Sequence, residues 1–172
     1  MNFILIGYMA SGKSKIGVEL SKILSFDYLD LDEVIEKNEK KDINLIFKDH
    51  GEIYFRKKEK EHLTNLLNSV DNTIISLGGG TPCYFDTMDS LLLNENVTTI
   101  YLKVSIPVLV SRLKKEKAKR PLVAHIDTDE LLTEFIGKHL FERNTFYSRA
   151  EYTTNANGSI NEIVEGIILK LF

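Results

Sequence analysis

The sequence lacks several features that mark secreted and membrane proteins. It holds one cysteine, Cys83, among 172 residues, so a disulfide within the chain is excluded and a reducing compartment is favoured. No apolar run approaches the length that crosses a membrane, and the first residues enter an expected strand rather than a signal peptide. We therefore expect a cytoplasmic protein with no membrane partner. We interpret Cys83 as an ordinary loop residue, the alternative being a reactive thiol.

The chain also has little excess charge of one sign. Its net charge is −3 and its isoelectric point is about 5.8, which argues against nucleic acid as a partner. The four histidines show no spacing typical of metal ligands. Hydrophobic residues make up 43% and charged residues 27%, the balance of a globular protein, and no repeat or linker divides the chain. We expect one domain over residues 1–172.

Strand and helix patterns alternate along the chain. The pattern predicts strands at residues 2–7, 27–30, 73–77, 98–103 and 151–154. It predicts helices at residues 13–25, 31–37, 43–48, 52–68, 87–93, 106–117, 128–147 and 159–171. Such alternation is typical of a parallel sheet covered by helices on both faces. Ligands of these sheets bind at the carboxyl ends of the strands, where we expect the functional residues.

The first expected strand leads into the pattern G-x-x-x-x-G-K-S at residues 7–14. A glycine-bounded loop followed by a helix N-terminus forms a cradle for phosphate, so the sequence predicts an ATP or GTP site. The backbone N–H groups expected to face the phosphates belong to Ala10, Ser11, Gly12, Lys13, Ser14 and Lys15. Lys13 is expected to reach the β- and γ-phosphates, and the Ser14 hydroxyl to bind Mg²⁺. The alternative is a strand-to-helix turn without a ligand, which the flanking elements disfavour.

Two carboxylates, Asp30 and Asp32, stand at the end of the second expected strand. In an extended chain residues i and i+2 face the same way, so both are expected to point into the phosphate cleft. A small-molecule kinase needs one carboxylate near Mg²⁺ and one near the acceptor hydroxyl. The alternative is that an aspartate here caps the following helix.

The expected helix at residues 52–68 carries charge on its apolar face. Arg56 and Glu59 are three residues apart, on roughly the face that holds Phe55 and Leu63. An inward charge must be paired or bound to a ligand, so we expect Arg56 to bind a substrate carboxylate and Glu59 to hold its guanidinium. The alternative is an exposed Glu52–Arg56 pair.

Three further features indicate a ligand site. Gly78, Gly79 and Gly80 follow the third expected strand and leave room for a ligand against the backbone. Arg143 lies on the apolar stripe of its helix, which indicates an inward partner unless the side chain reaches the helix edge. Residues 114–127 form a polar segment typical of a lid, and Arg120 within it is either an arginine finger or an ordinary exposed arginine.

With these motifs in this order, the chain resembles the shikimate kinases nearly end to end. The shared patterns are the P-loop, the D-x-D of residues 30–32, G-E-x-x-F-R at residues 51–56, G-G-G at residues 78–80, R-P-L at residues 120–122 and R-x-x-x-Y at residues 143–147. The resemblance implies ATP-dependent phosphorylation of the 3-hydroxyl of shikimate in aromatic amino-acid biosynthesis, with Mg²⁺, by a monomer. It implies a three-layer α/β/α P-loop kinase fold with a five-stranded parallel sheet, a substrate-binding subdomain at residues 31–62 and a mobile lid at residues 114–127.

The resemblance also implies roles for single residues. Shikimate would be held by Asp32, Arg56, Gly78, Gly79, Gly80 and Arg143, with the two arginines around its carboxylate and Glu59 supporting Arg56. Catalysis would fall to Lys13, Asp32 and Arg120, and Mg²⁺ to Ser14 and Asp30. Besides the P-loop and Arg120, the ATP contacts would include Arg112 and Asn155 near the adenine.

Two departures and two rival functions remain. Ala10 stands where glycine is frequent in the family. Alanine is tolerated at this position if its φ is negative. Residues 40–43 replace the common Gly-Arg-Ser-Ile, so the turn into the substrate-binding subdomain is expected to differ. The rival functions are another small-metabolite kinase, such as a gluconate or nucleoside monophosphate kinase, and a non-catalytic nucleotide-binding domain.

Overall fold

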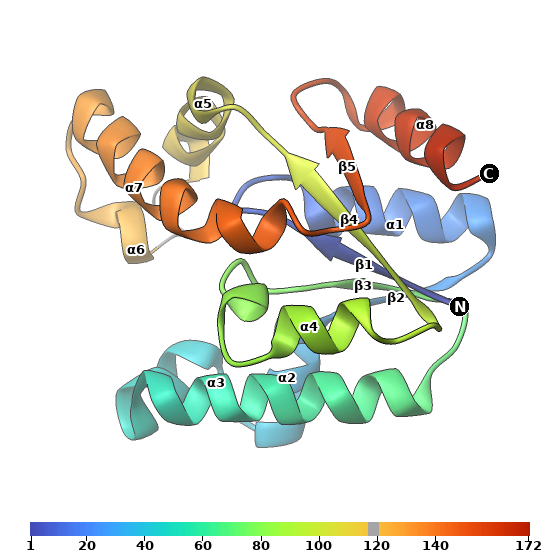
Figure 1. The fold of residues 1–172 in the computed structure, drawn as a ribbon. Coiled ribbons are helices and arrows are strands. Elements are labelled where there is room, and N and C mark those ends of the chain that lie inside the picture. Colours follow the sequence, from blue (N-terminus) through green and yellow to red (C-terminus); the bar gives the residue numbers. More distant parts are fainter. Residues whose placement is uncertain (117–120) are drawn as a thin grey trace.

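A five-stranded, wholly parallel sheet forms the centre of the computed structural model, which describes residues 1–116 and 121–172 (Figure 1). The strands are β1 (Asn2–Ile6), β2 (Asp27–Asp30), β3 (Thr73–Ser76), β4 (Val97–Lys103) and β5 (Tyr152–Asn155). Their spatial order is β2-β3-β1-β4-β5. The predicted strands are confirmed to within one residue at each end, as is the parallel sheet.

Helices connect the strands and cover both faces of the sheet. They are α1 (Lys13–Leu24), α2 (Leu31–Glu39), α3 (Ile43–Ser69), α4 (Thr87–Leu92), α5 (Ile106–Glu116), α7 (Asp129–Tyr147) and α8 (Ile160–Leu171). Two short elements were not predicted, the 3-10 helix η1 (Thr81–Cys83) and the helix α6 (Pro121–Ala124). Among the described residues, no helix combines the length and apolar character needed to span a membrane.

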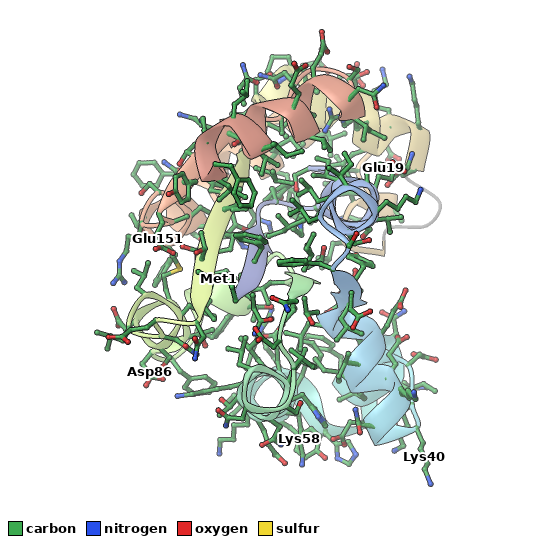
Figure 2. The ribbon with its side chains drawn as sticks, turned by 90° about the vertical axis from the view of Figure 1, so that its right-hand side faces the viewer. Met1, Glu19, Lys40, Lys58, Asp86 and Glu151 are labelled. Atoms are coloured by element: carbon green, nitrogen blue, oxygen red, sulfur yellow. The ribbon has the colours of Figure 1, made fainter. Side chains whose placement is uncertain are left out.

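The sheet is buried from both sides. Every residue of β1 is buried, because α1 and α8 pack on one face of the sheet and α4 and the end of α7 on the other. Figure 2 places Glu19 on α1 and Asp86 before α4 on opposite sides of the sheet. Lys58 on α3 and Lys40 after α2 lie together at one end of the molecule (Figure 2). The predicted three-layer α/β/α architecture is confirmed.

The long helix α3 is interrupted at Gly51. This residue has φ 81° and ψ 175°, values outside the helical region that glycine adopts without strain. The sequence predicted separate helices at residues 43–48 and 52–68, and the break lies between them as expected. The second segment buries Phe55, Glu59 and Leu63 on one face, so the predicted inward position of Glu59 is confirmed.

The strand order brings three loops together at the carboxyl edge of the sheet. The P-loop follows β1, Asp30 ends β2, and the three glycines follow β3. Because β3 pairs with both β1 and β2, Ser76 lies beside Leu5 in one register and beside Asp30 in the other. These loops therefore adjoin at the edge where ligands of parallel sheets bind.

Candidate active site

The P-loop adopts the geometry of a phosphate cradle at the N-terminus of α1. Gly12 caps this helix with φ 95°, in the left-handed region. The Lys13 Nζ donates to the carbonyl oxygens of Gly7 at 2.7 Å and Tyr8 at 3.0 Å. This places the ammonium group against the loop, beside the N–H groups at the positive end of the helix dipole.

Ala10 does not have the negative φ that would suit an alanine. Its φ is 60°, in the left-handed region where a Cβ crowds the neighbouring carbonyl oxygen. Lys40 has φ 53° at the C-cap of α2, another position where glycine is the preferred residue. Because both residues have a Cβ and a left-handed φ, each side chain here strains its backbone.

We expect Ala10→Gly and Lys40→Gly each to raise the free energy of unfolding by about 0.5–1 kcal/mol, since the backbone strain exceeds the added entropy of the unfolded chain. Urea unfolding of the purified variants measures this. Ala124→Gly, at an exposed residue of α6, is the control and should destabilise. Loss of stability in both Ala10→Gly and Lys40→Gly would contradict the assignment of strain.

A cavity of about 510 Å³ opens at the carboxyl edge of the sheet. Its lining comes from the P-loop, the end of β2, the loop after β3, α5 and the start of α8. The residues are Met9, Ala10, Ser11, Gly12, Lys13, Ser14, Lys15, Ile16, Asp30, Asp32, Leu77, Gly78, Gly79, Arg112, Lys115, Glu116, Gly158, Ile160 and Ile163. The structure thus brings most of the predicted nucleotide residues to one cavity together with Asp30 and Asp32.

Asp30 and Asp32 reach this cavity for a reason that differs from the predicted one. Strand β2 ends at Asp30, and Asp32 already belongs to the first turn of α2, so strand alternation does not align them. Asp30 caps the helix instead, its Oδ1 accepting from the Asp32 backbone N–H at 3.0 Å. Its Oδ2 accepts from the Ser14 hydroxyl at 3.3 Å. The capping alternative is correct for Asp30, and the cap directs both carboxylates into the cavity.

Among the carboxyl groups of residues 1–116 and 121–172, Asp32 stands out by a raised pKa. Burial, together with the nearby carboxylates of Asp30 and Glu59, raises the pKa of Asp32 to about 6, and Lys13 acts in the opposite direction. A carboxyl group with a pKa near 6 is ionised at neutral pH and is a stronger proton acceptor than an exposed aspartate. This is the property expected of a general base.

Arg112 connects the P-loop with the loop after β5. Its guanidinium donates to the carbonyl oxygens of Ala10 at 3.2 Å and Ala156 at 2.9 Å. Asn155, the other predicted adenine contact, is not brought to the cavity wall, because its Oδ1 accepts from the Asn157 backbone at 3.1 Å in a local turn. Gly158 and Ile160 line the cavity in its place, and only the loop geometry identifies them.

Arg56 points inward from α3, as predicted. Its side chain is 11% exposed, and its Nη1 donates to the Glu59 carboxylate at 2.9 Å. Glu59 is 2% exposed and also accepts from the Thr81 hydroxyl at 2.6 Å. The expected alternative pair is present too, because Glu52 lies 3.5 Å from Nε of Arg56. The buried carboxylate of Glu59 therefore fixes Arg56 against η1.

Arg143 approaches the glycine loop, residues 78–80 after β3, from α7. A methyl group placed on Gly79 would lie 3.2 Å from its Nη1, and one placed on Gly80 would lie 2.5 Å from Nη2 of Arg56. The Arg143 guanidinium carbon lies 5.6 Å from the Tyr8 ring centre. The two guanidinium groups thus flank the backbone of Gly79 and Gly80, where a side chain on Gly80 would displace Arg56.

Two tyrosines around these arginines carry no signal in the sequence. Tyr84 lies over Arg56, with 4.2 Å between the guanidinium carbon and the ring centre. Tyr8 is 1% exposed, its hydroxyl lies 3.1 Å from Nδ1 of His139, and burial raises its pKa to about 12. Each contact joins segments far apart in the chain, so a local pattern does not reveal it.

Cys83 follows the glycine loop and is half-buried. Burial raises the pKa of its thiol to about 11, against the lowering effect of Arg143 and Arg56. The thiol is therefore protonated at neutral pH, which supports the interpretation of an unreactive residue, but Cys83 is the last residue of η1 and not the predicted loop residue.

The predicted lid is described only in part. Arg120 lies outside the described residues, so its predicted role as an arginine finger is not described by the structure. Beyond it, α6 and the residues that follow are anchored to the core, because Val123 is fully buried and Ile126 is 8% exposed. The C-terminal part of the segment at residues 114–127 thus carries two buried side chains, and the lid itself stays a prediction.

The protein has a parallel sheet with a P-loop after its first strand. The carboxylate of Asp32 and the guanidinium groups of Arg56 and Arg143 lie beside that loop. This combination defines the protein as a P-loop kinase. The profile of the shikimate kinase family matches residues 9–172. The chain is 50% identical over 150 residues to the shikimate kinase of Flavobacterium psychrophilum, which covers 87% of this chain and 86% of the relative. It is 48% identical over 166 residues to that of Flavobacterium johnsoniae, covering 96% and 95% of the two chains. This chain belongs to the shikimate kinase family.

Solved structures agree with this assignment. The crystal structure of shikimate kinase from Bacteroides thetaiotaomicron superposes with a TM-score of 0.91 at 32% identity, covering 99% of this chain and 98% of that one. The shikimate complex of the Acinetobacter baumannii enzyme gives a TM-score of 0.84 at 27% identity, covering 99% and 92%. A gluconokinase from Sinorhizobium meliloti gives 0.66 at 16% identity, covering 99% and 90%, and shares the fold alone.

Proposed function

We propose that this chain transfers the γ-phosphoryl group of ATP to the 3-hydroxyl of shikimate. One observation supports this function above the others: Asp32 and the glycines after β3 line the P-loop cavity, and the guanidinium groups of Arg56 on α3 and Arg143 on α7 flank those glycines. A phosphate cradle, a base and a carboxylate clamp are the parts that phosphorylation of a hydroxy acid requires. Membership of the family supports shikimate as the acid.

The nucleotide side of the site rests on the P-loop. We propose that its backbone N–H groups from Ala10 to Lys15 hold the phosphates and that Lys13 compensates their charge. Arg112 and the loop after β5 would border the adenine, with Asn155 acting through its turn. Arg120 would stabilise the transferring group when residues 114–127 close as a lid and exclude water.

The acceptor side lies between α3 and α7, in the subdomain at residues 31–62 and the glycine loop. Arg56 and Arg143 would bind the carboxylate and so fix the orientation of the ring. Glycines at residues 78–80 leave the space that a ring against the backbone needs. Asp32 would then orient the attacking hydroxyl and accept its proton.

The donor set at Ser14 and Asp30 fits a magnesium ion. A hydroxyl and a carboxylate 3.3 Å apart, next to the phosphate cradle, are the oxygen ligands that Mg²⁺ takes alongside phosphates and waters. When bound, the ion would offset charge on the phosphate oxygens. The Ser14 hydroxyl and the Asp30 carboxylate would hold it at the start of α1.

The decisive experiment is an ADP-release assay with MgATP and a panel of acceptors. We expect release with shikimate, and little with quinate, gluconate or AMP. Release with gluconate or AMP in preference to shikimate would support the rival kinase functions. ATP binding without release on any acceptor would support a non-catalytic domain.

We also propose that the enzyme acts as a monomer in the cytoplasm. Size-exclusion chromatography with light scattering tests the oligomeric state.

A further inference from the structure

The guanidinium of Arg56 is enclosed by aromatic groups from two elements. The ring of Tyr84, directly after η1, lies 4.2 Å from the guanidinium carbon, and the ring of Phe55 lies 5.2 Å from it. Both distances fall within the range of a cation–π interaction, and a guanidinium stacks well on an aromatic ring. Tyr84 thus covers one face of the only arginine on α3.

Glu52 holds Tyr84 in this position. The Tyr84 hydroxyl donates to Oε1 of Glu52 at 2.6 Å, and the same oxygen lies 3.5 Å from Nε of Arg56. Glu52 is one helical turn before Arg56, so the three side chains form a closed triangle between α3 and the loop after η1. The hydroxyl of Tyr84 is the donor, because the nearby carboxylate of Glu52 raises the pKa of Tyr84.

These contacts leave one edge of the guanidinium directed at the glycine loop. Nη1 donates to Glu59, Nε faces Glu52, and Nη2 lies where a methyl group on Gly80 would clash at 2.5 Å. We propose that Tyr84 and Glu52 are positioning residues, which hold Arg56 so that its Nη2 edge faces the substrate carboxylate before shikimate binds. The inference rests on the proposed function, in which Arg56 binds that carboxylate.

An arginine side chain loses much rotational freedom when it is fixed in one geometry. If the protein fixes it in advance, substrate binding does not have to supply that ordering, and affinity rises. Glu59 fixes the guanidinium through one nitrogen, Nη1. The stack on Tyr84 and the contact of Nε with Glu52 hold one face and a second nitrogen of the guanidinium, so three groups fix its geometry.

The test measures steady-state kinetics of Tyr84→Leu and Tyr84→Phe with shikimate and MgATP. We expect Tyr84→Leu to raise the KM for shikimate by about three- to thirtyfold, the range of a partly desolvated cation–π contact. Tyr84→Phe keeps the ring and should raise it about two- to threefold. The kcat and the KM for ATP should stay within about twofold of wild type, since a positioning role acts on substrate binding. Phe85→Leu is the control, because Phe85 is exposed and stacks on Lys60 instead.

A double-mutant cycle shows whether Tyr84 acts through Arg56. In an Arg56→Lys background, which loses the planar guanidinium, Tyr84→Leu should raise the KM less than about 1.5-fold further. Full additivity in this background would overturn the inference, and so would an unchanged KM in Tyr84→Leu when Arg56→Lys itself weakens shikimate. If the wild-type chain does not phosphorylate shikimate at all, the proposed function fails instead. The two failures are thus distinguished by the wild-type assay.

Discussion

The Asp32→Asn variant is expected to turn over shikimate about 10²–10⁴ times more slowly than wild type, the range typical of losing a general base. An amide neither accepts the proton of the attacking hydroxyl nor orients it as a carboxylate does. Binding of MgATP should change less than about twofold, since the P-loop contacts remain. The ADP-release assay and a nucleotide titration measure the two quantities. Turnover close to wild type would show that Asp32 is not the general base.

The same substitution is expected to stabilise the protein at neutral pH. The pKa of Asp32 is about 6 in the folded protein and about 3.9 in an unfolded chain, so ionisation is disfavoured by folding. The contribution of Asp32 to stability therefore falls as the pH rises from about 4 through 6. Asp32→Asn should raise the free energy of unfolding by roughly 1–3 kcal/mol at pH 8 and by much less near pH 4.

Urea unfolding at both pH values measures this difference. Glu33→Gln removes an exposed carboxylate one residue further along α2 and is the matched control. It should change neither turnover nor the pH dependence of stability. A gain in stability for Asp32→Asn that is equal at pH 4 and pH 8 would show that the charge of Asp32 is not its cause.

Arg56→Ala is expected to raise the KM for shikimate by about 30- to 1,000-fold, as the loss of a buried, charge-assisted contact does. It should also lower the free energy of unfolding by about 3–5 kcal/mol, because Glu59 would keep a buried charge without its ion-pair partner Arg56, although the Thr81 hydroxyl would still donate to it. The KM for ATP should remain near its wild-type value. Kinetic assays and urea unfolding measure the two effects.

A second variant separates binding from stability. Arg56→Ala combined with Glu59→Gln removes both charges, so most of the lost stability should return while the KM for shikimate stays high. Lys57→Ala, at an exposed neighbour of Arg56, is the control and should alter neither quantity. An unchanged KM in Arg56→Ala would rule out the clamp, and a double variant as unstable as the single one would rule out the buried charge of Glu59 as the cause.

Local patterns in the sequence predict the elements of this fold well. Strands β1, β3 and β4 each carry their own apolar run, and the glycines at residues 7 and 12 mark the P-loop without reference to the rest of the chain. The inward position of Glu59 also follows from helical spacing, since Phe55, Glu59 and Leu63 are four residues apart. These features depend on neighbours in the sequence and are therefore visible there.

Other features of the site depend on contacts across the fold. Tyr84 stacks on Arg56, which is 28 residues earlier in the chain and on another element. Hydrophobic periodicity within one element does not predict a contact of this kind. The positions of Asp30 and Asp32 depend on the residue at which β2 ends, which is the least certain property of a predicted strand. The strain at Ala10 depends on its φ, and an alanine gives no sign of a left-handed backbone.

The break at Gly51 divides α3 into two segments, and we expect their amide protons to exchange as two separate units. The hydrogen-bond ladder of a helix transmits cooperativity only while it is continuous, so residues 43–50 can unfold locally while residues 52–69 stay intact. In the first segment Ile46 alone is buried, whereas the second is held by four buried side chains, including Glu59. In deuterium exchange the first segment should therefore label early and the second late, so we expect the segment of α3 that carries Phe47 to open while Arg56 stays in place.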